Sequence, residues 1–407
     1  MQTYELALLL DLLKQPTAPF REQRVVDFVT GWLERQRLPF FLDPLGNIVV
    51  GCDSPASYRR LVAARTREPL RLFMAHLDHP GFHGERWLAA DRLRVIWHGG
   101  APVKHLAGAP IWIATPDGRM LEGRLHRARL LPGGRSIESA EVRVAGVGRS
   151  ARPPATGLYG GFRFRAPVWR AGARLYAHAA DDLVGVFAIL ATARRLRPAR
   201  GAPFLGLLTR AEEVGFIGAI GHFELGWLLR ARRPVVCVSL ETSRTLPNAL
   251  IGKGPVVRLG DRRTVFDPGA LNVLTQVAVR TLPGRHQRRI MDGGTCEATA
   301  ATVFGLRAIG ISVPLGNYHN QGYEGGPDCR GPGGPAPEFV HLADVEGLIA
   351  LCRGLLRPGL PWDEPWTHER RVYAKRRRSY RALLEGPAPR QGHTRKTRNS
   401  TASSLRN

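Results

Sequence analysis

The chain has 407 residues, enough for one large domain or two smaller ones around a substantial core, and 43% of its residues are hydrophobic, as in ordinary globular proteins. No apolar run approaches the ~18 residues of a membrane span, so we expect no integral membrane protein. The net charge is +25, and the last forty residues carry twelve lysines and arginines against Glu369 and Glu385. We expect this C-terminal tail, residues 358–407, to be disordered and solvated, so nucleic acid is not an expected partner.

The N-terminal stretch YELALLLDLLKQ carries Glu5 and Asp11 within its apolar run, which predicts an amphipathic helix and not a signal peptide. The five cysteines are scattered and form no CxxC pair. They are expected to be reduced and mostly buried, as in a cytoplasmic protein.

Helical periodicity is present over residues 3–14 and 20–36, and the prolines at 16 and 19 separate the two helices. PFFLD and GNIVV, on either side of a Pro-Leu-Gly turn, predict a hairpin, and RLFMAH predicts a buried strand that ends at His76. Between residues 84 and 173, short alternating segments are separated by Gly, Pro and Asp. They predict an inserted all-β domain, a small barrel.

From residue 181 the pattern changes to alternating helices and strands. Helices are predicted over residues 181–196, 214–230, 270–282, 295–305 and 343–356, and strands over 204–209, 234–240 and 307–314. This alternation predicts an α/β fold whose mixed, mostly parallel sheet is flanked by helices. The catalytic domain would then comprise residues 1–83 and 174–357, interrupted by the insert at 84–173.

Acids and histidines follow the predicted strands in a fixed order. They are His76 with Asp78, Asp181 with Asp182, Glu212 with Glu213, Glu241, and His319. Sites in open α/β sheets form where strands end, so these loops should meet at one edge. Each group taken singly has an ordinary explanation as a helix cap, a surface acid or a hydrogen-bonded histidine. Together they predict a metal-dependent hydrolase, because crowded carboxylates repel one another unless cations offset their charge.

The sequence resembles the deblocking or glutamyl (tetrahedral) aminopeptidases, a family of dinuclear metallo-aminopeptidases. The resemblance rests on AHLDHPGF at 75–82, DDLVG at 181–185, EEVGFIGA at 212–219, SLETS around Glu241 and NYH at 317–319. Smaller matches are DPLGN at 43–47 and the Gly-Gly-Thr run at 293–295. The long interval between the first two motifs is similar to that of the tetrahedral group, and the resemblance covers about residues 1–355.

The resemblance implies a role for each of these residues. Asp181 would bridge two cations, His76 and Glu241 would complete one site, and Glu213 and His319 the other. Glu212 would be the general base and acid, and Asp78 would orient His76 through its far ring nitrogen. The peptide bond after Asp181 would be cis. The chain departs from the family pattern at His79, where an acid is commoner, and at Glu241, where Asp is commoner.

The resulting prediction is a cytoplasmic aminopeptidase that removes N-terminal residues from short peptides with two divalent ions, zinc or cobalt, or manganese as a further candidate. The resemblance also implies a homo-oligomer, with a dodecamer as one form. Two alternatives stay open: a dinuclear deacylase acting on N-acyl amino acids, and, from another class, a nucleic-acid-associated protein that uses the basic tail. The preferred N-terminal residue, the native metal and the subunit number stay open as well.

Overall fold

The computed structural model describes residues 1–148, 152–196 and 202–386. The chain divides into two compact units, Met1–Asp363 and Glu364–Asn407. The first unit contains the central sheet, an inserted barrel and all the residues predicted to form the site.

An eight-stranded sheet forms the centre of the first unit, within the described residues, in the order β1-β2-β12-β3-β13-β16-β14-β15. Its strands are β1 Phe40–Leu42, β2 Ile48–Val50, β3 Leu70–His76, β12 Phe204–Thr209, β13 Val235–Arg244, β14 Val256–Asp261, β15 Gln287–Met291 and β16 Arg307–Leu315. The four strands β12, β3, β13 and β16 are mutually parallel, while the β1–β2 hairpin joins β12 antiparallel and β14 joins β16 antiparallel. The predicted mixed and mostly parallel sheet is confirmed.

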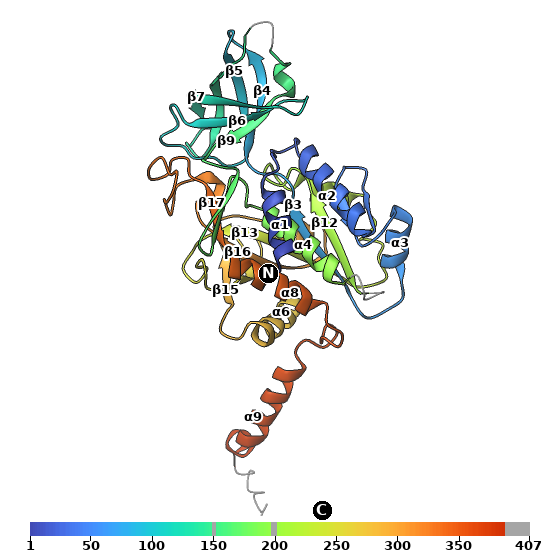
Figure 1. Ribbon diagram of the computed structural model, residues 1–407. Helices are drawn as coiled ribbons and strands as arrows, with labels where there is room; N and C mark the ends of the chain where they lie inside the picture. Colours follow the sequence, from blue (N-terminus) through green and yellow to red (C-terminus); the bar gives the residue numbers. More distant parts are fainter. Residues whose placement is uncertain (149–151, 197–201, 387–407) are drawn as a thin grey trace, which may run out of the picture. The chain divides into compact units, whose positions relative to one another are not determined.

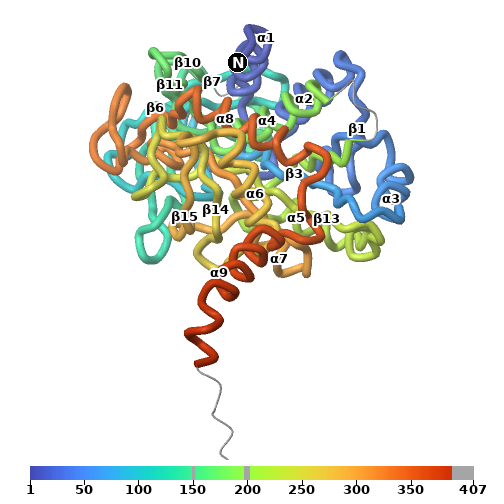
Figure 2. Tube along the Cα trace, turned by 90° about the horizontal axis from the view of Figure 1, so that it is seen from below, coloured from blue at the N-terminus to red at the C-terminus, as the bar shows by residue number. Residues whose placement is uncertain are grey.

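Helices cover both faces of this sheet. They are α1 Thr3–Leu13, α2 Gln23–Gln36, α3 Pro55–Ala63, α4 Leu183–Leu196, α5 Ile217–Glu224, α6 Pro268–Thr281, α7 Glu297–Val303 and α8 Leu342–Leu355. Helices α4 and α8 pack against each other, with α4 on β3 and α8 on β16, whereas α5 packs on α7, which contacts β13 and β16. Figure 2 shows α4 and α8 on one side of β3 and α5 and α7 on the other. Strands β3 and β12 are therefore buried along their whole length, as the continuous apolar runs LRLFMAH and FLGLLT require.

The insert is a closed antiparallel barrel with the strand order β4-β5-β8-β7-β6-β9. Its strands are β4 Gly81–Trp87, β5 Arg92–His98, β6 Pro110–Ala114, β7 Met120–Leu130, β8 Ile137–Val144 and β9 Tyr159–Phe162 (Figure 1). Alternating side chains of β5 point inward, and the barrel has an apolar core of its own. The predicted small all-β barrel is confirmed.

The bounds of this barrel differ from those expected for the insert, residues 84–173. The barrel begins at Gly81 and its last strand ends at Phe162. Strand β10 (Val168–Ala171), which the sequence placed inside the insert, pairs instead with β11 (Arg174–Ala177), which pairs with β17 (Glu338–His341). An alternating run such as FRFRAPVW predicts strands but does not show which sheet each one joins.

The second unit contains helix α9, Thr367–Glu385, where the sequence analysis expected disorder. The helix is rich in arginine, alanine and leucine, which favour helices, and Arg381 pairs with Glu385 one turn further on. The expectation of disorder is therefore corrected for residues 367–385, while the part of the tail from 387 to 407 lies outside the described residues.

Two further expectations can be compared with the structure. All five cysteines are free, and four of them are buried. Among the described residues, no helix is both long and apolar enough to cross a membrane.

Candidate metal centre

The candidate site lies where parallel strands of the central sheet end. His76 is the last residue of β3, and its neighbour in register on β12 is Thr209, which is followed closely by Glu212 and Glu213. Glu241 lies near the end of β13. The sequence positions the groups in this way because parallel strands present their carboxyl ends at one edge.

Two loops complete this edge. Asp181 lies just before α4, in a cis peptide bond to Asp182, as the resemblance implied. His319 lies in a 3₁₀ turn, Tyr318–Asn320, that follows β16. The site is thus assembled from segments that are distant in sequence, as the motif order predicted.

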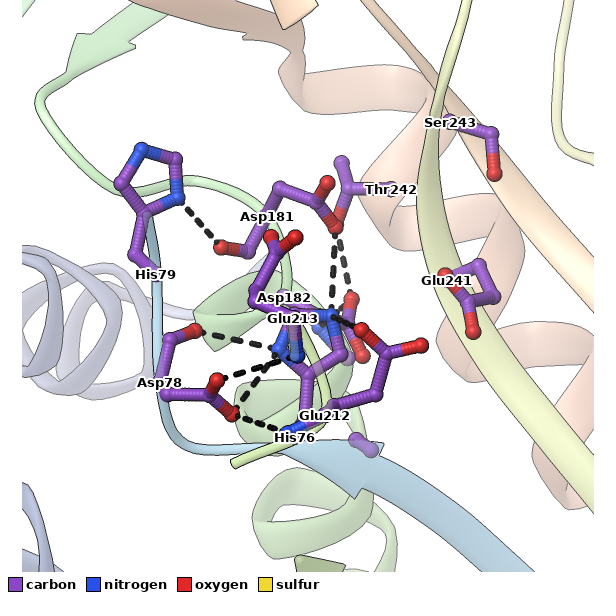
Figure 3. Close-up of polar contacts among 12 residues, drawn as sticks. His76, Asp78, His79, Asp181, Asp182, Glu212, Glu213, Glu241, Thr242 and Ser243 are labelled. Atoms are coloured by element: carbon purple, nitrogen blue, oxygen red, sulfur yellow. Dashed lines mark hydrogen bonds and ion pairs between the residues drawn. The ribbon is translucent and has the colours of Figure 1, made fainter. Parts of the chain in front are cut away.

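Asp181 lies between the two histidines. Its Oδ1 is 3.5 Å from His76 Nε2, and its Oδ2 is 3.7 Å from His319 Nε2. Glu213 Oε2 is 3.1 Å from His319 Nε2. Ligand atoms of His76, Asp181 and Glu213 all lie within 4.8 Å of one another, and Figure 3 shows these side chains gathered beside Glu212. One carboxylate with an imidazole on each side is the arrangement that a bridging ligand needs.

These residues fit a divalent cation. Asp181 Oδ1 and Glu213 Oε1 are buried, and the described residues supply no hydrogen-bond partner for either atom. Buried polar atoms are normally satisfied, so these two unpaired carboxylate oxygens indicate a missing partner. Imidazole and carboxylate together are ligands that zinc, cobalt and manganese accept.

Glu241 is set apart from this group (Figure 3). Its Oε1 accepts a hydrogen bond from Ser239 Oγ at 3.1 Å, and its Oε2 is 3.8 Å from Arg258 Nη1. Burial raises the pKa of Glu241 to about 7, with Arg258 acting in the opposite direction. Glu241 is therefore the predicted ligand that the structure brings least close to the others.

Asp78 has a wider role than the one expected. Its carboxylate accepts the backbone N–H of Glu212 at 2.9 Å and that of Glu213 at 3.1 Å. The ring Nδ1 of His76 lies 3.0 Å from the Asp78 carbonyl oxygen and 3.7 Å from its carboxylate. Asp78 thus orients His76 mainly through its backbone, while its side chain fixes the loop that carries both glutamates.

Glu212 faces the same cluster, with its Oε2 3.8 Å from His76 Nε2. Burial is the main reason that the pKa of Glu212 is well above its usual value, and the carboxylates of Glu241 and Glu213 raise it further. Glu213 behaves in the opposite way, because the His319 imidazole outweighs burial and lowers its pKa to about 2. Two adjacent glutamates with pKa values shifted in opposite directions suit two different roles, a proton carrier and a permanently charged ligand.

Three supporting residues were not predicted. Glu338 on β17 accepts the backbone N–H groups of Asp181 and His319 at 3.1 and 2.8 Å. Thr242 Oγ1 donates to Asp182 Oδ1 at 2.7 Å. His79, noted only as a departure from the family pattern, lies with Nδ1 2.9 Å from the Asp181 carbonyl oxygen and Nε2 3.3 Å from Asn320 Oδ1.

A cavity of about 150 Å³ adjoins the site beside Glu241. Its wall contains Arg258, which donates from Nη1 to Ser243 Oγ at 3.3 Å. It also contains Arg244, whose guanidinium carbon lies 3.9 Å from the ring centre of Tyr323. The cavity places two guanidinium groups next to the candidate metal centre.

Comparison with known proteins agrees with this geometry. Residues 157–323, which include Asp181, Glu212, Glu213, Glu241 and His319, match the model of the M42 glutamyl aminopeptidase family. The chain is related to the M42 glutamyl aminopeptidases. It is accordingly a metal-dependent aminopeptidase, a hydrolase that acts on peptide bonds, as the motifs predicted. A search of curated proteins gives no match.

Solved structures share the fold. A TET aminopeptidase from a marine sediment Thaumarchaeota archaeon superposes with a TM-score of 0.70 at 19% identity, covering 89% of this chain and 100% of that one. An aminopeptidase from Desulfurococcus kamchatkensis gives 0.68 at 20% identity, with 88% and 97% covered. The Pyrococcus horikoshii TET1 peptidase, described as assembling into a tetrahedron or a large octahedral shell, gives 0.67 at 18% identity, with 87% and 99% covered. The two-part fold of sheet and inserted barrel is thus that of the TET aminopeptidases.

Proposed function

We propose that this metal-dependent aminopeptidase uses two divalent cations that share Asp181. His319 and Glu213 would hold one of them, and His76 and Glu241 the other. The observation that carries this proposal is the position of Asp181, whose two carboxylate oxygens each face a different imidazole at 3.5 and 3.7 Å. When bound, the cations would polarise the scissile carbonyl and lower the pKa of the attacking water.

The chain's own residues would then move the proton. Glu212 is buried, lies beside His76 and is held by the hydrogen bond from its backbone N–H to Asp78. From there its carboxylate would accept a proton from the attacking water and deliver it to the leaving amine. Asp78 would keep Glu212 and Glu213 pointing into the same space while this happens.

The cavity beside Glu241 would receive the side chain of the N-terminal residue. Arg244 and Arg258 give its wall positive charge, so a substrate with an acidic first residue would gain charge-assisted hydrogen bonds there. The related family is described as glutamyl aminopeptidases, which agrees with this preference. The substrates would be short peptides that begin with Glu or Asp.

The test compares wild type with Glu212→Gln on a panel of aminoacyl-arylamides, with metal content measured in parallel. We expect two ions per chain in both proteins, and a kcat for Glu212→Gln about 10²- to 10⁴-fold lower, because the variant lacks only the proton carrier. Glutamyl and aspartyl substrates should give the highest kcat/KM. Glu224→Gln, at the exposed end of α5, is the matched control and should behave as wild type.

Other outcomes would distinguish the alternatives. Bound metal with turnover of N-acyl amino acids and none of free-amine substrates would favour the deacylase. Failure to bind any divalent cation after reconstitution would exclude the metal centre. Similar kcat/KM values for all aminoacyl-arylamides of the panel would exclude the preference for acidic residues but would leave the proposed metal centre and the role of Glu212 intact.

The oligomeric state and the cellular location are also part of this proposal. The TET relatives are described as dodecamers or as tetrahedral and octahedral shells, which supports a homo-oligomer here, and light scattering would give the subunit number. The free cysteines are in keeping with a reducing, cytoplasmic location.

A further inference from the structure

Helix α9 carries a dense positive charge that the aminopeptidase does not use. The helix has 19 residues, none of them buried, and it belongs to the second compact unit. It contains seven lysines and arginines and two acids. The basic residues are Arg370, Arg371, Lys375, Arg376, Arg377, Arg378 and Arg381.

Most of this charge has no partner of opposite sign. Arg370 pairs with Glu364, and Arg381 pairs with Glu385. Within the described part of the second unit, no carboxylate forms an ion pair with the remaining five, which are Arg371, Lys375, Arg376, Arg377 and Arg378. Five unpaired cations on one short helix repel one another unless water or an anionic partner screens their charge. The phosphates of a nucleic acid are a partner with the opposite charge at regular spacing.

Two exposed tyrosines lie among these cations. Tyr373 is 63% exposed and Tyr380 is 64% exposed, far more than tyrosine rings in a packed protein. They are seven residues apart, so they share one face of the helix, and Arg377 lies between them on that face. Aromatic rings interleaved with arginines can stack on unpaired bases while the guanidinium groups contact phosphates.

The distribution of charge does not suit a membrane surface. Arg371, Lys375 and Arg378 follow the same helical spacing on the face opposite the tyrosines, while Arg377 lies within the tyrosine stripe, so the tyrosine face is itself interrupted by a cation. A helix that lies in a membrane interface needs one continuous apolar face opposite its charged face. The exposed leucines of α9, Leu383 and Leu384, occur only at its last turn.

We propose that helix α9 is a binding site for single-stranded nucleic acid. The strand would pass around the helix, with its phosphates contacting the five unpaired cations on both faces and its bases stacking on Tyr373 and Tyr380. The site is independent of the aminopeptidase chemistry, since every residue of the candidate metal centre lies in Met1–Asp363. Binding would be tolerant of base sequence, because every base has a face that can stack.

The test is fluorescence anisotropy of a labelled 20-nucleotide single-stranded RNA of mixed sequence with the full-length protein, measured over a range of salt concentrations. With about five phosphate contacts, the slope of log K against log salt should be about −3.5. Replacing Lys375, Arg376, Arg377 and Arg378 by glutamine keeps helix-forming residues in place and should reduce the slope to about −0.7. Affinity should fall at least about tenfold at near-physiological salt.

Two further variants test whether RNA binding depends on helix α9 or only on the net positive charge of the protein. Replacing Arg59, Arg60, Arg65 and Arg67, all exposed in the first unit, by glutamine removes the same charge and should change RNA affinity little. Tyr373→Leu with Tyr380→Leu should weaken binding about fivefold or more at an unchanged salt slope, because stacking carries no charge.

Several results would overturn the proposal. No measurable RNA binding by the wild type, an equal loss of binding in the body control, or helix-dependent binding to phosphatidylserine vesicles without binding to RNA would each do so. Binding of double-stranded RNA that equals or exceeds that of the single strand would exclude the assignment to single strands. Single-stranded DNA of the same sequence should bind, because it offers the same phosphates and stacking faces, and its failure to bind would contradict this mechanism.

Discussion

Glu338 connects the two loops that carry Asp181, the proposed bridging carboxylate, and His319. Its Oε2 accepts the backbone N–H groups of Ala180 and Asp181, and its Oε1 accepts that of His319. The side chain is fully buried, and burial raises its pKa well above the usual value, with the Asp181 carboxylate adding to the effect. A single side chain therefore sets the distance between Asp181 and His319.

Glu338→Gln should weaken cation binding about 10- to 100-fold, the usual cost of removing a group that orients metal ligands. An amide nitrogen in place of one oxygen would face N–H donors, so at least one of the three hydrogen bonds is lost. A competition titration against a chromophoric chelator measures the affinity, and circular dichroism checks that the variant is folded.

Glu138→Gln is the control, since Glu138 pairs with Arg129 at the surface of the barrel. Unchanged cation affinity in a folded Glu338→Gln variant would show that the two loops keep their positions without this carboxylate.

The sequence could predict the candidate ligands but not Glu338. His76, Asp181, Glu213 and His319 follow strand ends within recognisable motifs, so their convergence follows from the parallel sheet. Glu338 stands in an ordinary apolar stretch, and its partners are remote in sequence. Backbone N–H groups leave no trace in side-chain patterns, so only the folded structure reveals this contact.

At the scale of elements, the barrel contributes directly to the wall of the site. The segment after β5 brings Gly99 and Gly100 against the site, where a Cβ atom on Gly100 would lie 2.0 Å from His319 Nδ1. The segment is held in place, because the Gly99 carbonyl accepts from Ser136 Oγ at 2.8 Å and the Gly100 carbonyl from Trp97 Nε1 at 3.3 Å. The insert therefore forms part of the wall of the candidate site in addition to having its own apolar core.

Gly100→Ala should displace the His319 ring and lower cation affinity at least about tenfold, because a metal ligand is moved away from its position. Its effect on the melting temperature should be small, since no core contact is removed. Gly148→Ala, where a Cβ atom has nothing within 4 Å, is the matched control. Equal metal affinity in both variants would mean that the segment, and not His319, gives way.

The hairpin turn between β1 and β2 is tied to the loop that carries Glu212. Asp43 Oδ2 lies 2.9 Å from His222 Nδ1 and accepts from Asn47 Nδ2 at 2.8 Å. Asn47 in turn contacts both ends of the loop, the Arg210 N–H and the Gly218 carbonyl. The DPLGN run noted in the sequence thus supports the glutamate loop through side-chain hydrogen bonds.

Asp43→Asn should lower the free energy of unfolding by about 2 kcal/mol at pH 7, the scale of a lost charge-assisted hydrogen bond in a buried site. Burial would raise the pKa of Asp43, but the hydrogen bonds with His222 and Asn47 outweigh it and lower the pKa. A lowered pKa stabilises the fold above the unfolded value of about 3.9, and that stabilisation is lost as the pH falls through the folded value. The difference between wild type and variant should therefore be constant from pH 7 to about 5 and shrink below about 4.

Urea unfolding at several pH values measures this difference. Asp11→Asn, an exposed partner of Lys14, should show a small difference. A difference for Asp43→Asn that grows on acidification would contradict the assignment of the lowered pKa.

The sequence predicted the main helices and strands of the fold but not how all the strands pair. The β/α segments were predicted because helices and strands differ in hydrophobic period. Strands β14 and β15 at the sheet edge, the short helix α3 and the three-stranded sheet of β10, β11 and β17 were not predicted. Edge strands such as β15, in which Arg288 and Ile290 are exposed, lack the continuous buried apolar pattern of β3. Pairing across distant segments is decided by tertiary contacts.

At the scale of the whole molecule, the candidate metal centre and the basic helix α9 belong to different units of the chain. Every predicted site residue, the cavity beside Glu241 and the barrel lie within Met1–Asp363, whereas α9 lies in Glu364–Asn407. A unit with its own hydrophobic core can fold by itself. This division makes the aminopeptidase and the proposed nucleic-acid site separable.

Truncation after Asp363 should therefore leave metal content unchanged and kcat/KM within about twofold of wild type, because every residue of the candidate site lies in the first unit. RNA binding should be lost in the same protein. The full chain carrying the four glutamine replacements in α9 serves as the control, since it removes the charge without shortening the chain. Loss of peptidase activity on truncation, with activity retained in that control, would contradict this prediction. It would show that the aminopeptidase activity depends on the second unit.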